Sequence, residues 1–327
     1  MKLTVVVPLF NEEAVIEDTN RRLIGLAGDL AEKRLINDHE IIYVDDGSTD
    51  SSLDILKRFA ETSPKIKVLS FSRNFGHQRA LVAGILHSSG DAVVSLDADL
   101  QDPPELIEEM INRYRMGNDI VYAARRERET DTLFKRLTAR IFYRLMGFMG
   151  ADVIYDHADY RMISRKVVAE FRKIREVNIF LRGIFPFLGF KYDVIYYDRQ
   201  KRHAGATKYP LRRMIAFAWE GITSFSDVPL RLASFSGLIM FMVSICLIMW
   251  AFYTKIVGRA IPGWASIVIP LSFIGGLNIL FLGIIGEYIG KIYLEVKKRP
   301  LYIIKESYNI KSGEVTTADF CNSLDES

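Results

Sequence analysis

Two long stretches without a charged side chain dominate the last third of this 327-residue chain. One lies between Arg231 and Lys255, and the other lies between Arg259 and Glu287. About 20 apolar residues are enough for a helix to cross a bilayer, and a buried core helix is seldom apolar on all sides over such a length. The stretches therefore predict a hairpin of two transmembrane helices within residues 231–290. A pair of buried core helices is the alternative.

Aromatic and basic residues flank this predicted hairpin. Trp250, Tyr253 and Trp264 lie near the ends of the two stretches, and amphipathic rings prefer the interface between lipid and water. The loop between the stretches carries Lys255 and Arg259, whereas basic residues are more numerous on both outer sides. By the positive-inside rule, both ends of the chain are expected in the cytoplasm.

The composition argues against two other kinds of protein. A net charge of +3 is too small to indicate nucleic-acid binding, so no nucleic-acid partner is expected. Cys246 and Cys321 are the two cysteines of the chain, and they stand in an apolar stretch and in a polar tail. They form neither a disulfide framework nor a CxxC metal motif.

The first 125 residues or so alternate between strand and helix patterns. Strands are expected at residues 3–9, 41–44, 66–71, 92–96 and 119–123, with helices between them. This pattern predicts an α/β fold whose mostly parallel sheet is covered by helices on both faces. Ligands of such a sheet bind beyond the carboxyl ends of its strands, so the acidic clusters found there mark the expected site.

Asp97 and Asp99 follow the fourth expected strand, in the sequence Asp97-Ala98-Asp99-Leu100-Gln101. Alternate residues of an extended segment point to the same side, so these two carboxylates can share one hard divalent cation. Such a cation would neutralise a diphosphate leaving group. The alternative is that these acids only cap the following helix.

Three further acidic or basic segments are candidates. Asp45 and Asp46 end the second expected strand, where they could accept hydrogen bonds from a base or a ribose, or simply cap a turn. Asp156 and Asp159 flank a histidine, and either could be a catalytic carboxylate. The basic loop at residues 199–208 could close over phosphate groups, or could only touch lipid headgroups.

Two segments show the apolar spacing of amphipathic helices. The first covers residues 211–230, directly before the hairpin, and predicts a helix in the membrane interface. The second covers residues 134–148, where an interfacial helix and an ordinary surface helix are equally good interpretations.

Together, these motifs resemble the family 2 glycosyltransferases with the Rossmann-like GT-A fold, and in particular their polyprenyl-phosphate branch of dolichol-phosphate mannose synthases and bactoprenol glucosyltransferases. The likeness extends from about Lys2 to Pro300. It is carried by Val7-Pro8-Leu9-Phe10-Asn11-Glu12, Asp45-Asp46-Gly47-Ser48, Asp97-Ala98-Asp99-Leu100-Gln101, Asp159-Tyr160-Arg161 and the basic loop.

The resemblance implies roles for individual residues. Asp97, Asp99 and Gln101 would bind a divalent cation, Mg²⁺ or Mn²⁺, and Asp159 is favoured over Asp156 as the catalytic carboxylate. The residues implied in binding the nucleotide-sugar donor are Pro8, Glu12, Asp45, Asp46, Asp97, Arg125, Arg202 and Lys208.

The resemblance also implies an inverting transfer of a hexose, glucose from UDP-glucose, onto undecaprenyl phosphate. The product would be a lipid-linked sugar for cell-envelope glycans such as lipopolysaccharide. The protein is expected as a multi-pass protein of the bacterial inner membrane, in contact with the lipid bilayer, and a homo-oligomer is an open option. The implied regions are a cytoplasmic catalytic domain (1–210), a juxtamembrane helix (211–230), two spans (231–290) and a cytoplasmic tail (291–327).

Two positions, Ala158 and Ala206, depart from the residues common in this family. They leave open another sugar, such as mannose from GDP-mannose or an amino-arabinose. Two functions of a different class are also compatible with the motifs. One is a non-catalytic membrane scaffold that keeps the fold, and the second is a metal-dependent nucleotidyltransferase.

Overall fold

The computed structural model describes residues 1–125, 157–174, 176–177, 179–198, 228–257 and 265–310. The chain divides into two compact units. The first comprises residues 1–143, 152–209 and 298–327, and the second comprises residues 144–151 and 210–297.

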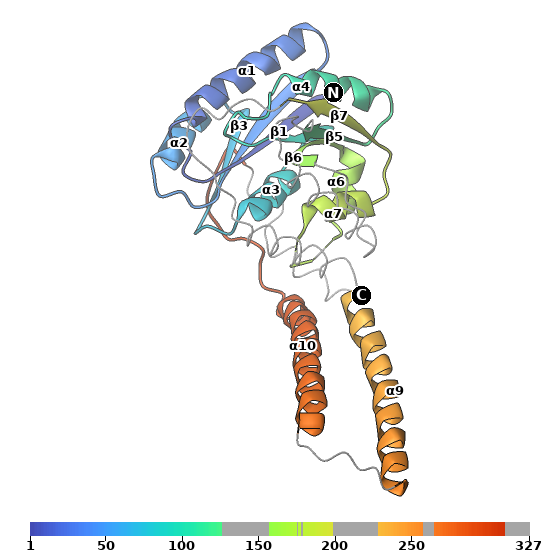
Figure 1. Cartoon of the computed structure of the whole chain (residues 1–327). Helices are drawn as coiled ribbons and strands as arrows, with labels where there is room; N and C mark the ends of the chain where they lie inside the picture. Colours follow the sequence, from blue (N-terminus) through green and yellow to red (C-terminus); the bar gives the residue numbers. More distant parts are fainter. Residues whose placement is uncertain (126–156, 175, 178, 199–227, 258–264, 311–327) are drawn as a thin grey trace, which may run out of the picture. The chain divides into compact units, whose positions relative to one another are not determined.

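The first unit is built on an eight-stranded sheet with the order β7-β5-β6-β4-β1-β2-β3-β8 (Figure 1). Its first five strands lie where the sequence predicts them. In this part of the sheet, β1 pairs in parallel with β2 and β4, and β2 pairs in parallel with β3. The bounds of all strands are β1 Lys2–Leu9, β2 Asp38–Asp45, β3 Ile66–Phe71, β4 Ala92–Ser95, β5 Ile120–Arg125, β6 His157–Ser164, β7 Tyr192–Tyr197 and β8 Ile304–Tyr308.

Three strands lie outside the predicted pattern. β6 is antiparallel to both β4 and β5, β7 is parallel to β5, and β8 is antiparallel to β3. The sheet is therefore mixed but mostly parallel, as predicted. The three additional strands come from segments that pair with residues far away in the sequence, so no local pattern announces their partners.

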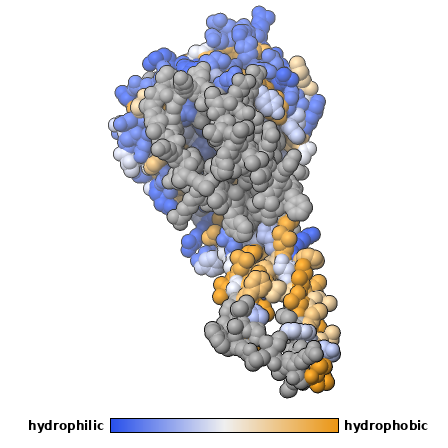
Figure 2. Space-filling model, viewed as in Figure 1, coloured by the Kyte–Doolittle hydropathy of each residue, from blue (hydrophilic) through white to orange (hydrophobic). Residues whose placement is uncertain are grey.

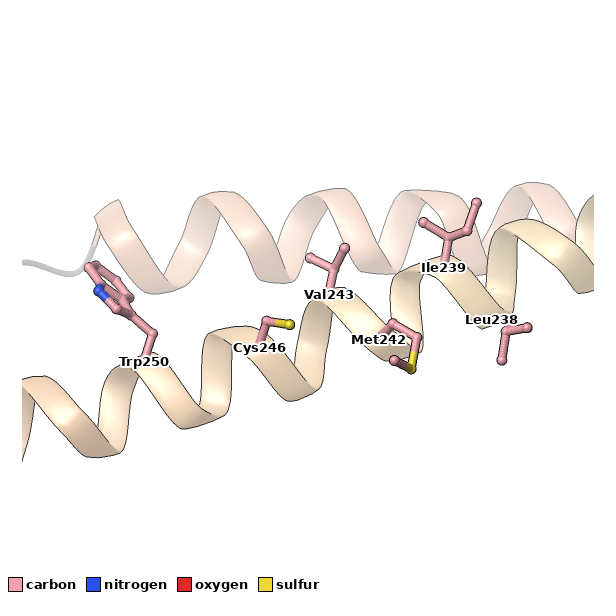
Figure 3. Close-up of a pocket in the computed structure, with 6 residues that line it drawn as sticks. All are labelled: Leu238, Ile239, Met242, Val243, Cys246 and Trp250. Atoms are coloured by element: carbon pink, nitrogen blue, oxygen red, sulfur yellow. The ribbon is translucent and has the colours of Figure 1, made fainter.

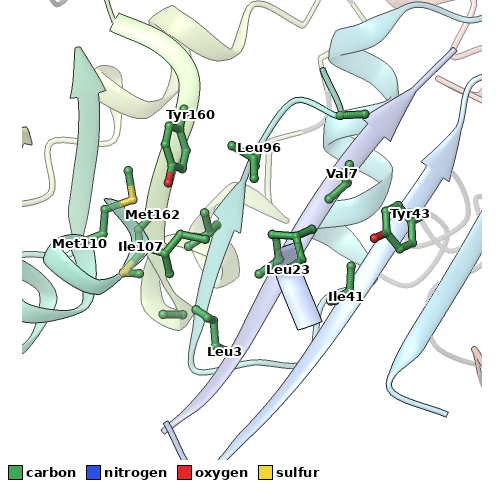
Figure 4. Close-up of a cluster of buried hydrophobic side chains, with 14 of the residues drawn as sticks. Leu3, Val7, Leu23, Ile41, Tyr43, Leu96, Ile107, Met110, Tyr160 and Met162 are labelled. Atoms are coloured by element: carbon green, nitrogen blue, oxygen red, sulfur yellow. The ribbon is translucent and has the colours of Figure 1, made fainter. Parts of the chain in front are cut away.

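Helices cover both faces of the sheet. The bounds in this unit are α1 Ile16–Glu32, α2 Ser52–Thr62, α3 His77–Leu86, α4 Leu106–Arg115, α6 Arg165–Phe171 and α7 Leu181–Phe187. One face packs against α1, α2 and α4 in an apolar core that includes Leu3, Val7, Leu23, Ile107 and Met110 (Figure 4). Burying each such side chain contributes about 1.5–3 kcal/mol.

The opposite face of the sheet packs against α3. This helix approaches β1 so closely that a Cβ atom built on Gly84 would lie 2.1 Å from Cγ1 of Val6. A residue without a side chain is therefore required at position 84. The close packing that Gly84 permits brings the first turn of α3 near the carboxyl ends of the strands.

The described part of the second unit consists of two long helices that contact each other, α9 (Val228–Ile256) and α10 (Ala265–Val296). Their described atoms are mostly apolar, whereas the visible described face of the first unit is mostly hydrophilic (Figure 2). A groove of about 540 Å³ runs along α9 (Figure 3). It is lined by Leu238, Ile239, Met242, Val243, Cys246 and Trp250.

Among the described residues, one stretch is long and apolar enough to cross a membrane, Phe273–Val296 of α10, and none of it is buried inside the protein. The apolar stretch Val228–Met240 of α9 is shorter than a span, and several α9 side chains beyond it lie outside the description. The predicted hairpin of two transmembrane helices stays a prediction.

Candidate active site

The candidate site lies beyond the carboxyl ends of the central strands, where the parallel topology predicts it. Asp97 follows β4, and Asp159 lies on β6. Because β4 and β6 are antiparallel and Ser95 stands opposite Arg161, continuing the two chains brings Asp97 and Asp159 next to each other. The Oγ atom of Ser95 also donates a hydrogen bond to the backbone oxygen of Asp159. Two acids that are far apart in the sequence thus meet at one end of the sheet.

His77, the first residue of α3, lies between these two acids. Its Nε2 atom is 3.5 Å from Oδ1 of Asp97 and 3.6 Å from Oδ2 of Asp159. Desolvation opposes protonation of the imidazole, but the interactions with the carboxylates of Asp159 and Asp97 outweigh it and raise the pKa of His77. His77 was not among the residues predicted from the sequence. The one sequence feature that could have indicated it is its position at the start of a helix, at the same edge of the sheet as the acids.

Two arginines hold the other side of Asp159. Arg161 is 1% exposed and donates to Oδ1 over 2.7 Å, and Arg182 of α7 donates to both oxygens over 3.3 and 3.4 Å. Burial opposes ionisation of Asp159, but the interaction with His77 and the charges of Arg182 and Arg161 hold the pKa of Asp159 well below the usual range. Asp159 is therefore an ionised group that is fixed in place. Arg182 was not among the residues predicted from the sequence.

Asp97 has the opposite electrostatic environment. Burial raises its pKa to about 6; His77 opposes this shift, and the negative charges of Asp159, Asp102 and Asp99 add to it. An excess of negative charge around a carboxylate is what a divalent cation would relieve, so the chemistry of Asp97 and Asp99 fits such an ion. Within the described residues, no group of three or more His, Cys, Asp or Glu side chains could hold a metal.

The loop after Asp97 is tightly built. Oδ1 of Asp99 accepts the backbone N–H of Gln101 over 3.2 Å, and Leu100 between them has a positive φ of 53°. Gln101 is 4% exposed, and in the part of the chain that the structure describes its Nε2 atom has no hydrogen-bond partner. Asp102 is buried and accepts a hydrogen bond from the Tyr197 hydroxyl. Cation binding by Gln101 stays a prediction.

Asp45 and Asp46 lie at the end of β2, and both are buried. Asp45 accepts hydrogen bonds from the Ser48 backbone and the Ser70 hydroxyl. Asp46 accepts the backbone N–H groups of Phe75 and Gly76 over 2.7 and 2.9 Å. Asp45 therefore caps the turn after β2, whereas Asp46 joins the end of β2 to the residues before α3. A contact of either residue with a nucleotide stays a prediction.

The two remaining donor-binding candidates on β1 and its loop lie near the same edge. Pro8 is buried on β1 opposite Val44, and the backbone N–H of Glu12 donates to the Ser52 hydroxyl over 2.9 Å. The loop after β1 is tied to the loop after β2, because Oδ1 of Asn11 accepts the backbone N–H of Thr49 over 2.8 Å. The loops that carry these candidates are therefore fixed to each other.

Several predicted residues lie outside the described part of the chain. They are Asp156, Arg202 and Lys208, together with the amphipathic segment at 134–148 and residues 211–227 of the segment at 211–230, whose remaining residues 228–230 begin α9. Arg125 ends β5 opposite Tyr197, and its side chain is outside the description. Their roles stay predictions.

Comparison with known proteins identifies the family. The model of the family "Glycosyl transferase family 2" matches residues 4–172. The chain is 46% identical over 306 residues to the uncharacterized glycosyltransferase YkoT of Bacillus subtilis, covering 92% of this chain and 90% of that protein. It is 40% identical over 313 residues to the bactoprenol glucosyl transferase of Shigella phage SfII, covering 94% and 99%.

A solved structure of glucosyl-3-phosphoglycerate synthase from Mycobacterium tuberculosis in complex with UDP is more distant, with a TM-score of 0.45 and 21% identity over 68% of this chain and 78% of that one. The family match and the long alignments agree with the acids gathered at the end of the sheet. This chain belongs to glycosyl transferase family 2 and is a glycosyltransferase.

Proposed function

We propose that this enzyme transfers glucose from UDP-glucose to undecaprenyl phosphate at the cytoplasmic face of a bacterial inner membrane. The observation that carries the proposal is the meeting of Asp97, His77 and Asp159 at the carboxyl end of the sheet. The acceptor class is supported by the identity, over nearly the whole chain, to proteins named bactoprenol glucosyl transferases.

The reaction would be a single displacement. A phosphate oxygen of the acceptor forms a bond to the anomeric carbon while the bond from that carbon to the donor diphosphate breaks, and nucleoside diphosphate leaves with the bonding electron pair. A phosphate monoester is already largely ionised near neutral pH, since its second pKa is about 6. The nucleophile therefore has little need of a general base.

The environment of Asp159 supports the same mechanism. Its carboxylate is engaged by Arg161 and Arg182, and its pKa is held well below the usual range, which makes it a poor proton acceptor. In the proposed mechanism Asp159 orients the acceptor or stabilises positive charge that develops on the sugar. Asp97 and Asp99 would hold a divalent cation, which supplies neutralising charge for the leaving diphosphate when bound.

The two long helices supply the proposed membrane anchor. The apolar stretch of α10 is unburied, whereas a core helix of a globular protein would be covered by other side chains. The proposal includes α9 as the second membrane helix, since it is 29 residues long and exposes apolar side chains along its described length. Both flanks of this hairpin would then face the cytoplasm.

The proposal is tested by supplying membranes that contain the protein with undecaprenyl phosphate, Mg²⁺ or Mn²⁺, and labelled UDP- and GDP-sugars one at a time. Label from UDP-glucose is expected in the organic-solvent extract, with release of UDP. Replacing Asp97 or Asp159 by Asn is expected to lower the rate at least about 100-fold, since each change removes charge from the reaction centre.

The control is Asp29→Asn, an exposed acid on α1, which is expected to retain the wild-type rate. No transfer of glucose label to lipid by the wild type, with label from GDP-mannose instead, would refute the sugar assignment. Release of pyrophosphate would point to a nucleotidyltransferase and refute the reaction class.

A further inference from the structure

His77 connects two acids that the proposed mechanism uses separately. Asp97, in the loop after β4, would bind the cation, and Asp159, on β6, would face the acceptor and the sugar. The imidazole Nε2 atom lies at nearly equal distances from one oxygen of each, 3.5 and 3.6 Å. Without a nitrogen donor between them, these two carboxylates would repel each other.

The backbone before His77 is fixed on both sides. Gly76 has a φ of 103°, which a residue with a side chain rarely adopts, and its N–H and that of Phe75 donate to the buried carboxylate of Asp46. The guanidinium of Arg79 donates to the backbone oxygen of Phe75 over 2.8 Å. The imidazole is therefore presented by a constrained turn at the start of α3.

The first turn of α3 is also joined to the helix that carries Arg182. Oε1 of Gln78 accepts the backbone N–H of Leu181 over 3.3 Å, and Arg182 donates to both oxygens of Asp159. The same carboxylate is thus held by α3 through His77, by α7 through Arg182, and by its own strand through Arg161. His77 also contacts Asp97.

We infer that His77 is a positioning residue of the sugar transfer, whose imidazole holds the carboxylates of Asp97 and Asp159 at a fixed separation. This inference rests on the proposed function. Its consequence is geometric, because the group that binds the cation and the group that faces the acceptor must act on the same anomeric carbon. Misplacing a reacting group by about 1 Å can lower a rate about 100-fold.

The kinetic test compares His77→Ala with His77→Lys. The alanine variant is expected to lower kcat by about 10- to 100-fold with the donor KM changed less than about threefold, since the interaction organises the reacting groups. The lysine variant returns a nitrogen donor to the space between the carboxylates and is expected to regain at least about fivefold in kcat. The matched control is His39→Ala, a half-buried histidine at the start of β2, which is expected to keep the wild-type kcat.

Two kinetic results would contradict the inference. One is a His77→Lys variant that is no faster than His77→Ala, which would show that a nitrogen donor between the two carboxylates does not determine kcat. The other is a wild-type kcat in His77→Ala. A residue with only a structural role would lower the unfolding midpoint without the rescue by lysine.

A second measurement needs no substrate, so it separates the failure of this inference from the failure of the proposed function. The unfolding midpoints of His77→Ala, Asp159→Asn and the double variant form a cycle. If the imidazole contacts Asp159, the double variant is expected to unfold at least about 2 °C above the value obtained by adding the single shifts. Additive shifts would refute the contact between His77 and Asp159. Absence of lipid labelling by the wild type would instead refute the proposed function alone.

Discussion

At the scale of single residues, Glu40 and Asp97 show opposite titration behaviour. Glu40, on β2 at the end remote from the site, accepts hydrogen bonds from Thr4 and Ser89 and lies 3.0 Å from the Lys67 ammonium. Burial opposes its ionisation, but the Ser89 and Thr4 hydrogen bonds and Lys67 lower the pKa of Glu40 to about 2. Desolvation, together with the negative charges of Asp159, Asp102 and Asp99, raises the pKa of Asp97 to about 6, although His77 opposes the shift. The contacts of Glu40 indicate a role in stability, whereas the negative charge around Asp97 suits this residue to bind a cation.

Replacing Glu40 by Gln tests the stabilising role of this carboxylate. Because the pKa of Glu40 falls from 4.5 to about 2 on folding, its contribution is fully present above pH 4.5 and is lost as the pH falls through about 2. The variant is expected to lower the free energy of unfolding by about 3 kcal/mol at pH 7. The difference should shrink steadily below pH 4.

Unfolding curves in detergent at pH 7 and pH 3 provide the measurement, with Glu32→Gln, an exposed acid at the end of α1, as the control. An equal loss of stability at both pH values would show that shape, and not charge, makes the contribution of Glu40.

At the scale of elements, the close approach of α3 to the sheet positions the candidate site. Gly84 lets the helix lie directly on β1 and β2, where a Cβ would meet Val6 at 2.1 Å and Val44 at 3.2 Å. Since His77 opens the same helix, a displacement of α3 moves the imidazole relative to Asp97 and Asp159. Helix packing and site geometry are therefore linked.

Gly84→Ala is expected to destabilise the protein by about 1–3 kcal/mol, because the added methyl group overpacks a buried contact with the stiff side chain of Val6. Its transfer rate should fall as well, since α3 must shift. Gly25→Ala is the matched control, because this glycine is exposed on α1 and a Cβ there meets nothing within 4 Å.

The control is expected to be neutral or stabilising by about 0.5–1 kcal/mol. Thermal unfolding and the lipid-labelling assay provide the two measurements. Equal stabilities of the two variants would contradict the close packing of α3.

At the scale of the whole molecule, the chain leaves the sheet for α9 and α10 and then returns to it as β8. The ring of Tyr302 stacks on Phe71 with centroids 4.9 Å apart, and Lys57 forms an ion pair with Glu306 over 3.0 Å. The Asn309 amide donates to three backbone oxygens, those of Ala60, Ser63 and Ile66. The segment after α10 was predicted only as a tail. In the structure, part of it is β8, an edge strand of the first unit's sheet.

Tyr302→Ala tests whether the segment after α10 stabilises the first unit. Tyr302 is 3% exposed, and loss of a buried aromatic ring is expected to cost about 3 kcal/mol of unfolding free energy. The neighbouring Ile303→Ala is the control, because Ile303 is 50% exposed and its loss should cost less than about 0.5 kcal/mol. Thermal unfolding of the full chain in detergent distinguishes them, and a Tyr302→Ala midpoint equal to that of the control would show that the packing of Tyr302 against Phe71 contributes nothing.

The sequence by itself determined what depends on near neighbours. The strands β1 to β5, the helices between them, the spacing of Asp97 and Asp99 and the long apolar stretches are all encoded in short, periodic patterns. The expected location of the candidate site followed as well, since parallel strands place their carboxyl ends at one edge. Function could be predicted to the level of family because several such motifs occur in one order.

The tertiary structure decided what depends on residues that are distant in the chain. The antiparallel strand β6 brings Asp159 beside Asp97, and α3 places His77 between them, although the three residues come from separate segments. The opposite pKa shifts of Asp97 and Asp159 depend on the same contacts, because the charges around a carboxylate are set by folding. No local pattern encodes those distances, since they arise when strand pairing and helix packing bring the segments together.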